Sequence, residues 1–246
     1  LDCTPDGRKI YLPTGENKTT NFNYVLDADG NILKKLVVSP RTHDNLCGLK
    51  GDYAYLETET SSYVSAVDTT TDQIAGTVGP FGDHVRPFTV NAGETLLFAC
   101  IEHLFGFEVA DMRTGRVLYR IPIRGFSYNP SRLAPSHGIG LTPNGQELWV
   151  CDATNPYVHV FDSSVMPPRQ KKAVRVSYPD THWITFDIAG RFAYISGPHG
   201  TSQPMDVIDT ATKLKAATIQ ASRNIVEVDF LNGTVTAVGS QWGVGR

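Results

Sequence analysis

Four of the seven histidines recur at similar intervals along the chain. Each precedes, by eight or nine residues, a glycine that comes one to three positions after a turn-forming residue. The four are His43, His84, His137 and His182. Neutral imidazole is a good ligand for transition metals. If the glycines mark equivalent points of a repeated structure, the four side chains share one structural position and could bind copper, iron or zinc.

The glycines themselves reveal an internal repeat. Each comes one to three positions after a turn residue and precedes an apolar stretch, as in Thr142-Pro143-Asn144-Gly145. The repeated positions are Gly7, Gly51, Gly93, Gly145, Gly190 and Gly233, with gaps of 44, 42, 52, 45 and 43 residues. This period is in the range of β-propeller blades and is too long for most helical repeats.

A second marker has the same phase as the glycines. An apolar stretch that ends in Asp follows each of the first five glycines by 17 to 20 residues. These aspartates are Asp27, Asp68, Asp111, Asp162 and Asp209. Short β-branched and aromatic runs dominate and helical periodicity is nearly absent, so each unit is predicted to be four antiparallel strands. We predict an all-β protein, a β-propeller of four-stranded blades; a β-sandwich would explain the strands but not the period.

The repeat predicts where the four histidines lie. In a propeller, the first strand of each blade starts on the face that also carries the loops between the second and third strands. His43, His84, His137 and His182 would therefore line the mouth of the central channel, with Asp44, Asp83 and Asp180 as supporting partners. The loop residues His103 and His199 should open onto the same face. The alternative is structural, with each imidazole bonded to a neighbouring turn.

The 52-residue gap places an enlarged loop at residues 124–135. Its aromatic and basic side chains are Arg124, Phe126, Tyr128 and Arg132, which could cover a ligand or hold an anion. The loop could equally pack over the junction between two blades.

Few other chemical signatures are present. The sequence has no Gly-x-Ser-x-Gly elbow, P-loop or dinucleotide fingerprint. Glu57, Glu59 and Asp152 fall at predicted second-strand ends, where they could supply oxygen ligands to calcium or simply be exposed loop acids. Cys3, Cys47, Cys100 and Cys151 have no metal-binding spacing, and we expect reduced, buried thiols in two equivalent pairs.

Residues 137–152, with the sequence HGIGLTPNGQELWVCD, resemble the YVTN-type (YncE-like) β-propeller repeat. The resemblance extends over essentially the whole chain. Such propellers serve as binding scaffolds, surface proteins, lactonase-like hydrolases and cofactor-bearing oxidoreductase domains, and an exported, periplasmic or extracellular location is implied by the resemblance alone. Family members generally close with seven blades.

We expect one propeller domain over residues 1–246, with about five and a half blades. The expected units are 1–40, 41–82, 83–135, 136–179, 180–223 and 224–246. Because the first visible strand starts inside a blade, we expect the natural protein to begin upstream, with seven blades or, alternatively, six.

Charge and hydropathy exclude some classes of function. A formal net charge of −3, from 22 basic and 25 acidic residues, gives no electrostatic signature of nucleic-acid binding. No apolar run in this chain approaches the length of a membrane span. Two functions remain open, a binding protein for a small molecule or a protein, and a metal-dependent oxidoreductase or lactonase-like hydrolase with a histidine-ligated metal.

Overall fold

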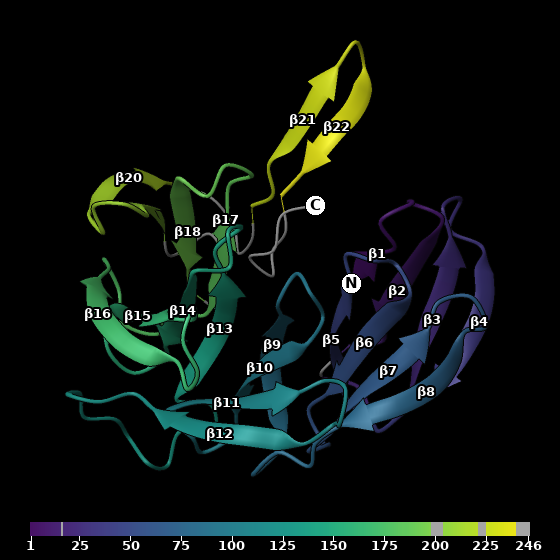
Figure 1. The fold of residues 1–246 in the computed structure, drawn as a ribbon, viewed down its shortest axis with the longest axis horizontal. Coiled ribbons are helices and arrows are strands. Elements are labelled where there is room, and N and C mark those ends of the chain that lie inside the picture. Colours follow the sequence, from purple (N-terminus) through teal and green to yellow (C-terminus); the bar gives the residue numbers. More distant parts are fainter. Residues whose placement is uncertain (16, 198–203, 221–224, 240–246) are drawn as a thin grey trace. The chain divides into compact units, whose positions relative to one another are not determined.

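The computed structural model describes residues 1–15, 17–197, 204–220 and 225–239. These residues form five four-stranded antiparallel sheets and one two-stranded sheet, and the described part of the chain contains no helix (Figure 1). No helix in the described ranges could therefore span a membrane. The prediction of an all-β chain built from four-stranded units is confirmed.

In every four-stranded sheet the spatial order of the strands follows the chain order. The first sheet comprises β1 (Asp2–Cys3), β2 (Lys9–Pro13), β3 (Phe22–Asp27) and β4 (Ile32–Val37). The second comprises β5 (Thr42–Cys47), β6 (Tyr53–Thr58), β7 (Val64–Asp68) and β8 (Gln73–Val78). The third comprises β9 (Val85–Val90), β10 (Leu96–Ile101), β11 (Gly106–Asp111) and β12 (Val117–Pro122).

The remaining sheets repeat this order. The fourth comprises β13 (Ser136–Leu141), β14 (Glu147–Asp152), β15 (Tyr157–Asp162) and β16 (Arg169–Arg175). The fifth comprises β17 (Trp183–Phe186), β18 (Phe192–Ser196), β19 (Met205–Asp209) and β20 (Lys215–Ile219). The last is a hairpin of β21 (Val228–Leu231) and β22 (Thr234–Val238).

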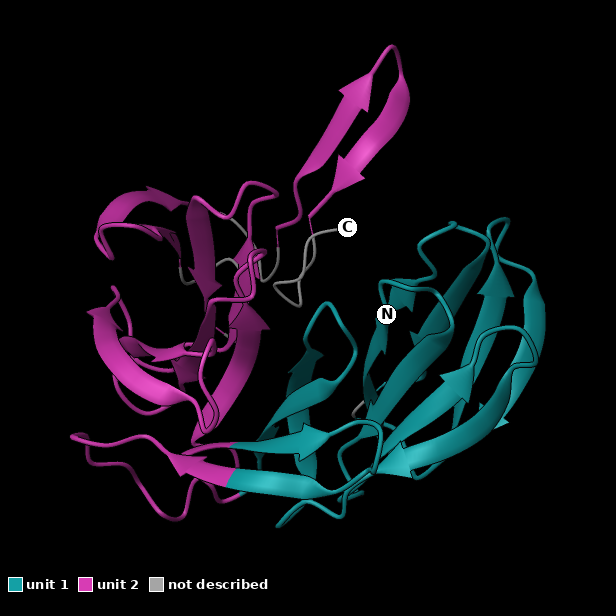
Figure 2. Cartoon of the chain, in the orientation of Figure 1, with its two compact units in different colours: residues 1–102, 108–119 teal, residues 103–107, 120–246 magenta. Residues whose placement is uncertain are grey.

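The chain divides into two compact units, coloured separately in Figure 2. Unit 1 contains residues 1–102 and 108–119, and unit 2 contains residues 103–107 and 120–246. In each unit the core lies between neighbouring sheets. In unit 1 the side chains of Tyr11 and Val25 from the first sheet pack with Leu56 and Val67 from the second. In unit 2 Trp149, Val158 and Val160 pack with side chains of the fifth sheet, among them Phe186.

Most of the repeated glycines close the turn between the first and second strands. The N–H of Gly51 donates to the carbonyl of Gly48, and that of Gly145 to Thr142. The φ angles of these glycines are 81° and 67°, in the left-handed region that glycine adopts without strain. In the third sheet the equivalent residue is Glu94, with a φ of 52°, whose N–H donates to Asn91. The sequence marker Gly93 is thus one residue out of phase with the turn.

The predicted aspartates end the third strands of all five four-stranded sheets. Each carboxylate accepts hydrogen bonds from backbone N–H groups of the following turn; Asp68 accepts from Thr70 and Thr71. For Asp68, Asp111 and Asp209, hydrogen bonds from these N–H groups lower the carboxyl pKa from its ordinary value. The local turn chemistry read from the sequence is therefore confirmed.

The cysteines form no disulfide in the described structure. Cys47, Cys100 and Cys151 are buried as expected, whereas Cys3 is exposed. As expected, Cys3 and Cys47 occupy equivalent positions in neighbouring sheets. Each directly precedes the turn between the first and second strands, which begins at Thr4 in the first sheet and at Gly48 in the second.

Candidate functional site

The second, third and fourth sheets share an irregularity at the start of the first strand. In the second sheet Thr42 pairs with Thr58 and Asn45 pairs with Leu56. Between these two pairs β5 has two residues, His43 and Asp44, whereas β6 has only one, Glu57. The same offset occurs between β9 and β10 and between β13 and β14. A β-bulge of this kind redirects side chains and is common beside functional sites. We call this end of each sheet the bulge end, and the opposite end the turn end.

The bulges show that His84 does not share the position of His43 and His137, contrary to the expectation from sequence. Each bulge begins one residue after the first ladder pair, which places His43 and His137 at the same point of their sheets. The residue at this point in the third sheet is Arg86, and His84 lies two positions earlier, before β9 begins. The miscount arose because Glu94, and not Gly93, occupies the left-handed position of that turn. His182 directly precedes β17 in a sheet whose first pair of strands has no bulge.

His43 and the next residue both contact Glu57 near the end of β6. The His43 Nδ1 atom lies 3.0 Å from Glu57 Oε2 and 3.5 Å from Asp44 Oδ2. The backbone N–H of Asp44 donates to the same Glu57 oxygen at 3.1 Å. Glu57 is fully buried, and this burial raises its pKa, while the hydrogen bond with His43 acts in the opposite direction. The expectation that Glu57 and Glu59 could be exposed loop acids is wrong, because both are buried in the sheet end.

The third sheet gathers charged groups at the same end. The Arg86 guanidinium is buried and donates to both Glu59 and Glu102. Glu59 also forms an ion pair with Arg41, and the His84 Nδ1 atom lies 3.3 Å from Glu102. The structure therefore places His43 and His84 each beside a buried carboxylate. The sequence did not single out Arg86, although its equivalence to His43 could have been found from the turn at residues 91–94.

In unit 2 the structure brings His137 and His182 together. Their rings stack with centroids 3.5 Å apart, and the Nδ1 atom of His137 lies 3.0 Å from the carbonyl oxygen of His182. The N–H of Gly138 donates to the same carbonyl at 2.8 Å. Trp183 packs edge-on against both imidazoles. The hydrogen bond from His137 and that from Gly138 hold β13 against the start of β17.

The last histidine of the fourth sheet, His159, is fully buried on β15. Its Nε2 atom lies 3.0 Å from Asp152 Oδ2. Asp152 also accepts hydrogen bonds from the backbone N–H groups of Thr154 and Asn155. All of these contacts lie inside the sheet, so Asp152 is a buried structural acceptor and not an exposed loop acid.

The enlarged loop at residues 124–135 packs against this histidine. The ring of Phe126 lies 4.7 Å from that of His159, and Tyr128 stacks on Phe105 at 4.8 Å. The backbone of Arg124 exchanges two hydrogen bonds with the side chain of Gln170.

Two more of the predicted ligand-binding residues belong to the same region. Arg132 forms an ion pair with Asp180, and the backbone N–H of His103 donates to Leu133. Each of Arg124, Phe126, Tyr128, Arg132 and His103 thus has a partner within unit 2. His199 lies outside the described residues.

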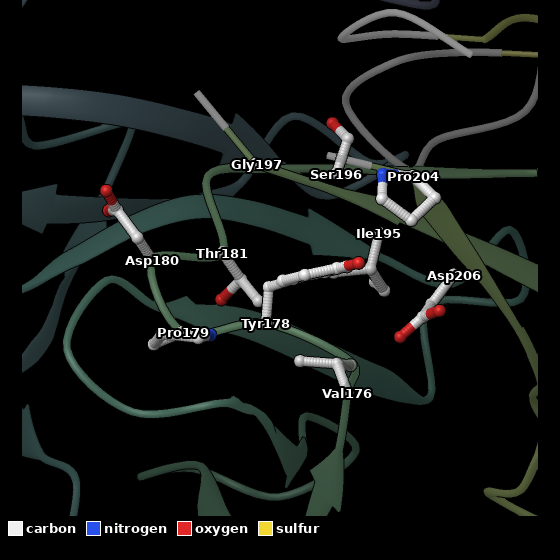
Figure 3. Close-up of a pocket in the computed structure, with 10 residues that line it drawn as sticks. All are labelled: Val176, Tyr178, Pro179, Asp180, Thr181, Ile195, Ser196, Gly197, Pro204 and Asp206. Carbon is white, nitrogen blue, oxygen red and sulfur yellow. The ribbon is translucent and has the colours of Figure 1, made fainter. Parts of the chain in front are cut away.

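One small pocket of unit 2 lies at the bulge end, where β14 and β18 end and β17 begins. Figure 3 shows Tyr178 lying across this pocket, which is also lined by Thr181, Ile195 and Asp206. Its volume is about 10 Å³, which suffices for a single water molecule. Larger open grooves, of about 440 and 490 Å³ in unit 1 and 560 Å³ in unit 2, are lined by residues of the turn ends.

Comparison with known proteins gives the fold. No family model matches the chain, and no match was found among curated proteins. Among solved structures the chain is similar to Kuenenia stuttgartiensis hydrazine synthase, with a TM-score of 0.66 and 15% identity over 85% of this chain and 61% of that chain. It is also similar to the dihydro-heme d1 dehydrogenase NirN in complex with DHE, with a TM-score of 0.67 and 14% identity over 100% of this chain and 54% of that chain. The chain has a β-propeller fold.

The comparisons establish the β-propeller fold of the chain but not what the chain binds or which reaction it catalyses. The chain spans about three fifths of the first structure and about half of the second. Propeller sheets carry many unrelated functions, so function has to be argued from particular side chains. In unit 1 these are the buried ionisable groups at the bulge ends of the second and third sheets.

Proposed function

We propose that the chain is a ligand-binding β-propeller domain that takes up a positively charged ligand at the bulge ends of unit 1. One observation carries the proposal, namely that four carboxylates and one guanidinium are buried there, with two of the carboxylates bonded to that guanidinium. Asp44, Glu57, Glu59 and Glu102 are at most 6% exposed, and so is Arg86. Arg41 adds a second, partly exposed positive charge.

The energetic argument favours a ligand over a purely structural role. Transferring a carboxylate out of water costs several kcal/mol unless partners compensate it, and replacing buried ion pairs by apolar side chains often does not destabilise a protein. Buried ionisable clusters of this kind are therefore concentrated at functional sites. An excess of negative charge over positive charge also attracts cations to the site.

The histidines belong to the same proposal. His43 and His84 stand beside Glu57 and Glu102, and of the two His43 would contribute a ring nitrogen to the ligand. In unit 2 the residue at the position of His43 is His137, which stacks on His182. The YncE-like character of the repeat supports an exported binding protein, periplasmic or extracellular, which fractionation of cells that produce the natural protein would test.

A metal-dependent enzyme is the second candidate, either an oxidoreductase or a lactonase-like hydrolase. It is favoured by the grouping of His43, Asp44 and Glu57, whose ligand atoms lie within 4.8 Å of one another. The two similar structures are both named for enzymes, a synthase and a dehydrogenase, which is consistent with this candidate.

The binding proposal is tested with labelled octalysine and octaglutamate peptides as probes, by fluorescence anisotropy at low and high salt. We expect octalysine alone to bind, and its binding to weaken as salt screens the charges. Glu59→Gln and Glu102→Gln should weaken binding several-fold, with folding checked by circular dichroism. Asp27→Asn, which removes the same charge at a turn end of unit 1, should leave it unchanged. Equal weakening by Asp27→Asn, or the absence of salt-sensitive binding, would rule out this site.

A further inference from the structure

The bulge of the second sheet gathers three metal-ligating side chains. His43 and Asp44 are the two bulge residues of β5, and Glu57 comes from the adjacent strand β6. Tetrahedral ligands bound at about 2.0 Å are separated by about 3.3 Å. The distances from His43 Nδ1 to Glu57 Oε2 and to Asp44 Oδ2, 3.0 and 3.5 Å, bracket this value. We propose that His43, Asp44 and Glu57 bind one divalent transition-metal ion.

An independent observation points to a missing partner at this site. The Glu57 Oε1 atom is buried and has no hydrogen-bond partner, although Oε2 of the same carboxylate contacts both His43 and the Asp44 N–H. Buried polar atoms in native proteins are nearly always bonded, and exceptions require an explanation such as an ion. A cation held between the three side chains supplies that partner.

The other sheets of the repeat provide an internal comparison. At the position of Glu57, one residue past the ladder pair nearest the bulge, the third and fourth sheets have Cys100 and Cys151. Both cysteines are fully buried. At the position of Asp44 the same sheets have Pro87 and Gly138. The repeat therefore accepts an uncharged residue at both positions, and the second sheet carries a carboxylate at both.

The donor set indicates the class of metal. One imidazole nitrogen and two carboxylate oxygens suit zinc, iron, cobalt or manganese, whereas calcium prefers six to eight oxygen ligands. Three protein ligands leave at least one coordination position for water or for another ligand. The site differs from a metal held by four histidines, because all three ligands come from one sheet.

The inference rests on the proposed function only in its location at a bulge end of unit 1.

To test it, wild-type protein freed of metal with a chelator is titrated with Zn²⁺, Mn²⁺ and Ca²⁺ by isothermal calorimetry. We expect one equivalent of Zn²⁺ or Mn²⁺ to bind more tightly than Ca²⁺ and to raise the Tm. His43→Gln and Glu57→Gln should weaken binding at least about 100-fold, beyond the 10- to 100-fold typical of residues that only support a ligand. The Tm of each metal-free variant shows whether it is folded.

His84→Gln is the matched control, since His84 lies at the bulge end of the neighbouring sheet outside this ligand set. It should bind the metal as the wild type does. Absence of a stoichiometric metal, or metal binding that Glu57→Gln leaves unchanged, overturns the inference. Loss of metal binding in His84→Gln also overturns it, because histidines from different sheets would then share the metal. If octalysine binds and no metal does, only this inference fails, and if the metal binds while octalysine does not, only the binding proposal fails.

Discussion

At the scale of single residues, Asp152 shows how a buried carboxylate organises the end of a sheet. Its Oδ1 atom accepts from two successive backbone N–H groups, at Thr154 and Asn155, each at 2.8 Å. Its Oδ2 atom contacts His159 and the side-chain amide of Asn155. Asp152 and His159 are both fully buried, so each depends on the other for compensation.

We predict that Asp152→Ala lowers the free energy of unfolding by about 3 kcal/mol, because several buried donors lose their acceptor at once. Asp152→Asn should lose less, since its remaining carbonyl oxygen can still accept from the two backbone N–H groups. Urea denaturation measures both values. The control is Asp162→Ala, which removes an exposed carboxylate at the other end of β15 and should have the smaller effect. Equal losses in the two alanine variants would show that Asp152 does not have this role.

At the scale of elements, the bulge at Gly138 allows two sheets of unit 2 to meet. The backbone of β13 approaches the start of β17 so closely that a Cβ atom at Gly138 would lie 2.5 Å from the carbonyl oxygen of His182. It would also lie 2.9 Å from the Cα atom of Trp183. Because both neighbours are backbone atoms, they cannot move aside as a flexible side chain could.

Gly138→Ala is therefore expected to lower the free energy of unfolding by about 1–3 kcal/mol and to disturb the stacking of His137 on His182. Gly76→Ala on β8 is the matched control, because a Cβ atom there meets nothing within 4 Å. Thermal unfolding measures both stabilities, and the histidine ring signals in NMR spectra report the stacking. A Gly138→Ala protein as stable as the control would contradict the close approach.

The repeat made the strands and turns predictable, and the limit of that prediction lies in the register between strands. Glycine and aspartate spacing is a local signal, and it correctly located the third-strand ends at Asp68 and Asp209. The bulge depends on which residues pair across two strands, and no sequence spacing reports that. The position shared by His43 and Arg86 was missed for a different reason, because Gly93 was taken for the turn residue in place of Glu94. The burial of Glu57 became clear only once β5 and β6 were paired.

At the scale of the whole molecule, the two units contain the same contact between sheets with its charges exchanged. In unit 1 the ammonium group of Lys9 on β2 lies 2.7 Å from Asp72, in the turn after β7. In unit 2 the equivalent strand position is Glu147 on β14, and its partner at 2.6 Å is Lys213, in the turn after β19. In both units the lysine also donates to a backbone carbonyl of that turn, at Thr69 or Thr210.

An aromatic residue two positions further along the strand supports the carboxylate in each unit. Tyr11 donates its hydroxyl hydrogen to Asp72 at 2.8 Å, and Trp149 donates its indole N–H to Glu147 at 3.0 Å. The repeat thus conserves an ion pair between neighbouring sheets while either sheet can supply the negative charge.

This exchange predicts that the charges of unit 1 can be reversed together. Lys9→Glu alone places two carboxylates side by side, and Asp72→Lys alone places two ammonium groups side by side, so each should lower the free energy of unfolding by about 2 kcal/mol. The double variant Lys9→Glu/Asp72→Lys reproduces the arrangement of unit 2, with Tyr11 able to donate to the new Glu as Trp149 does to Glu147. The double variant should regain most of the stability that the single variants lose, as a double-mutant cycle measured by urea denaturation would show. Lys213 shows that a lysine can adopt the left-handed conformation of this turn, with a φ of 63°. If the double variant loses the sum of the two single losses, the pair does not couple the sheets, and the likeness between the two units is one of geometry alone.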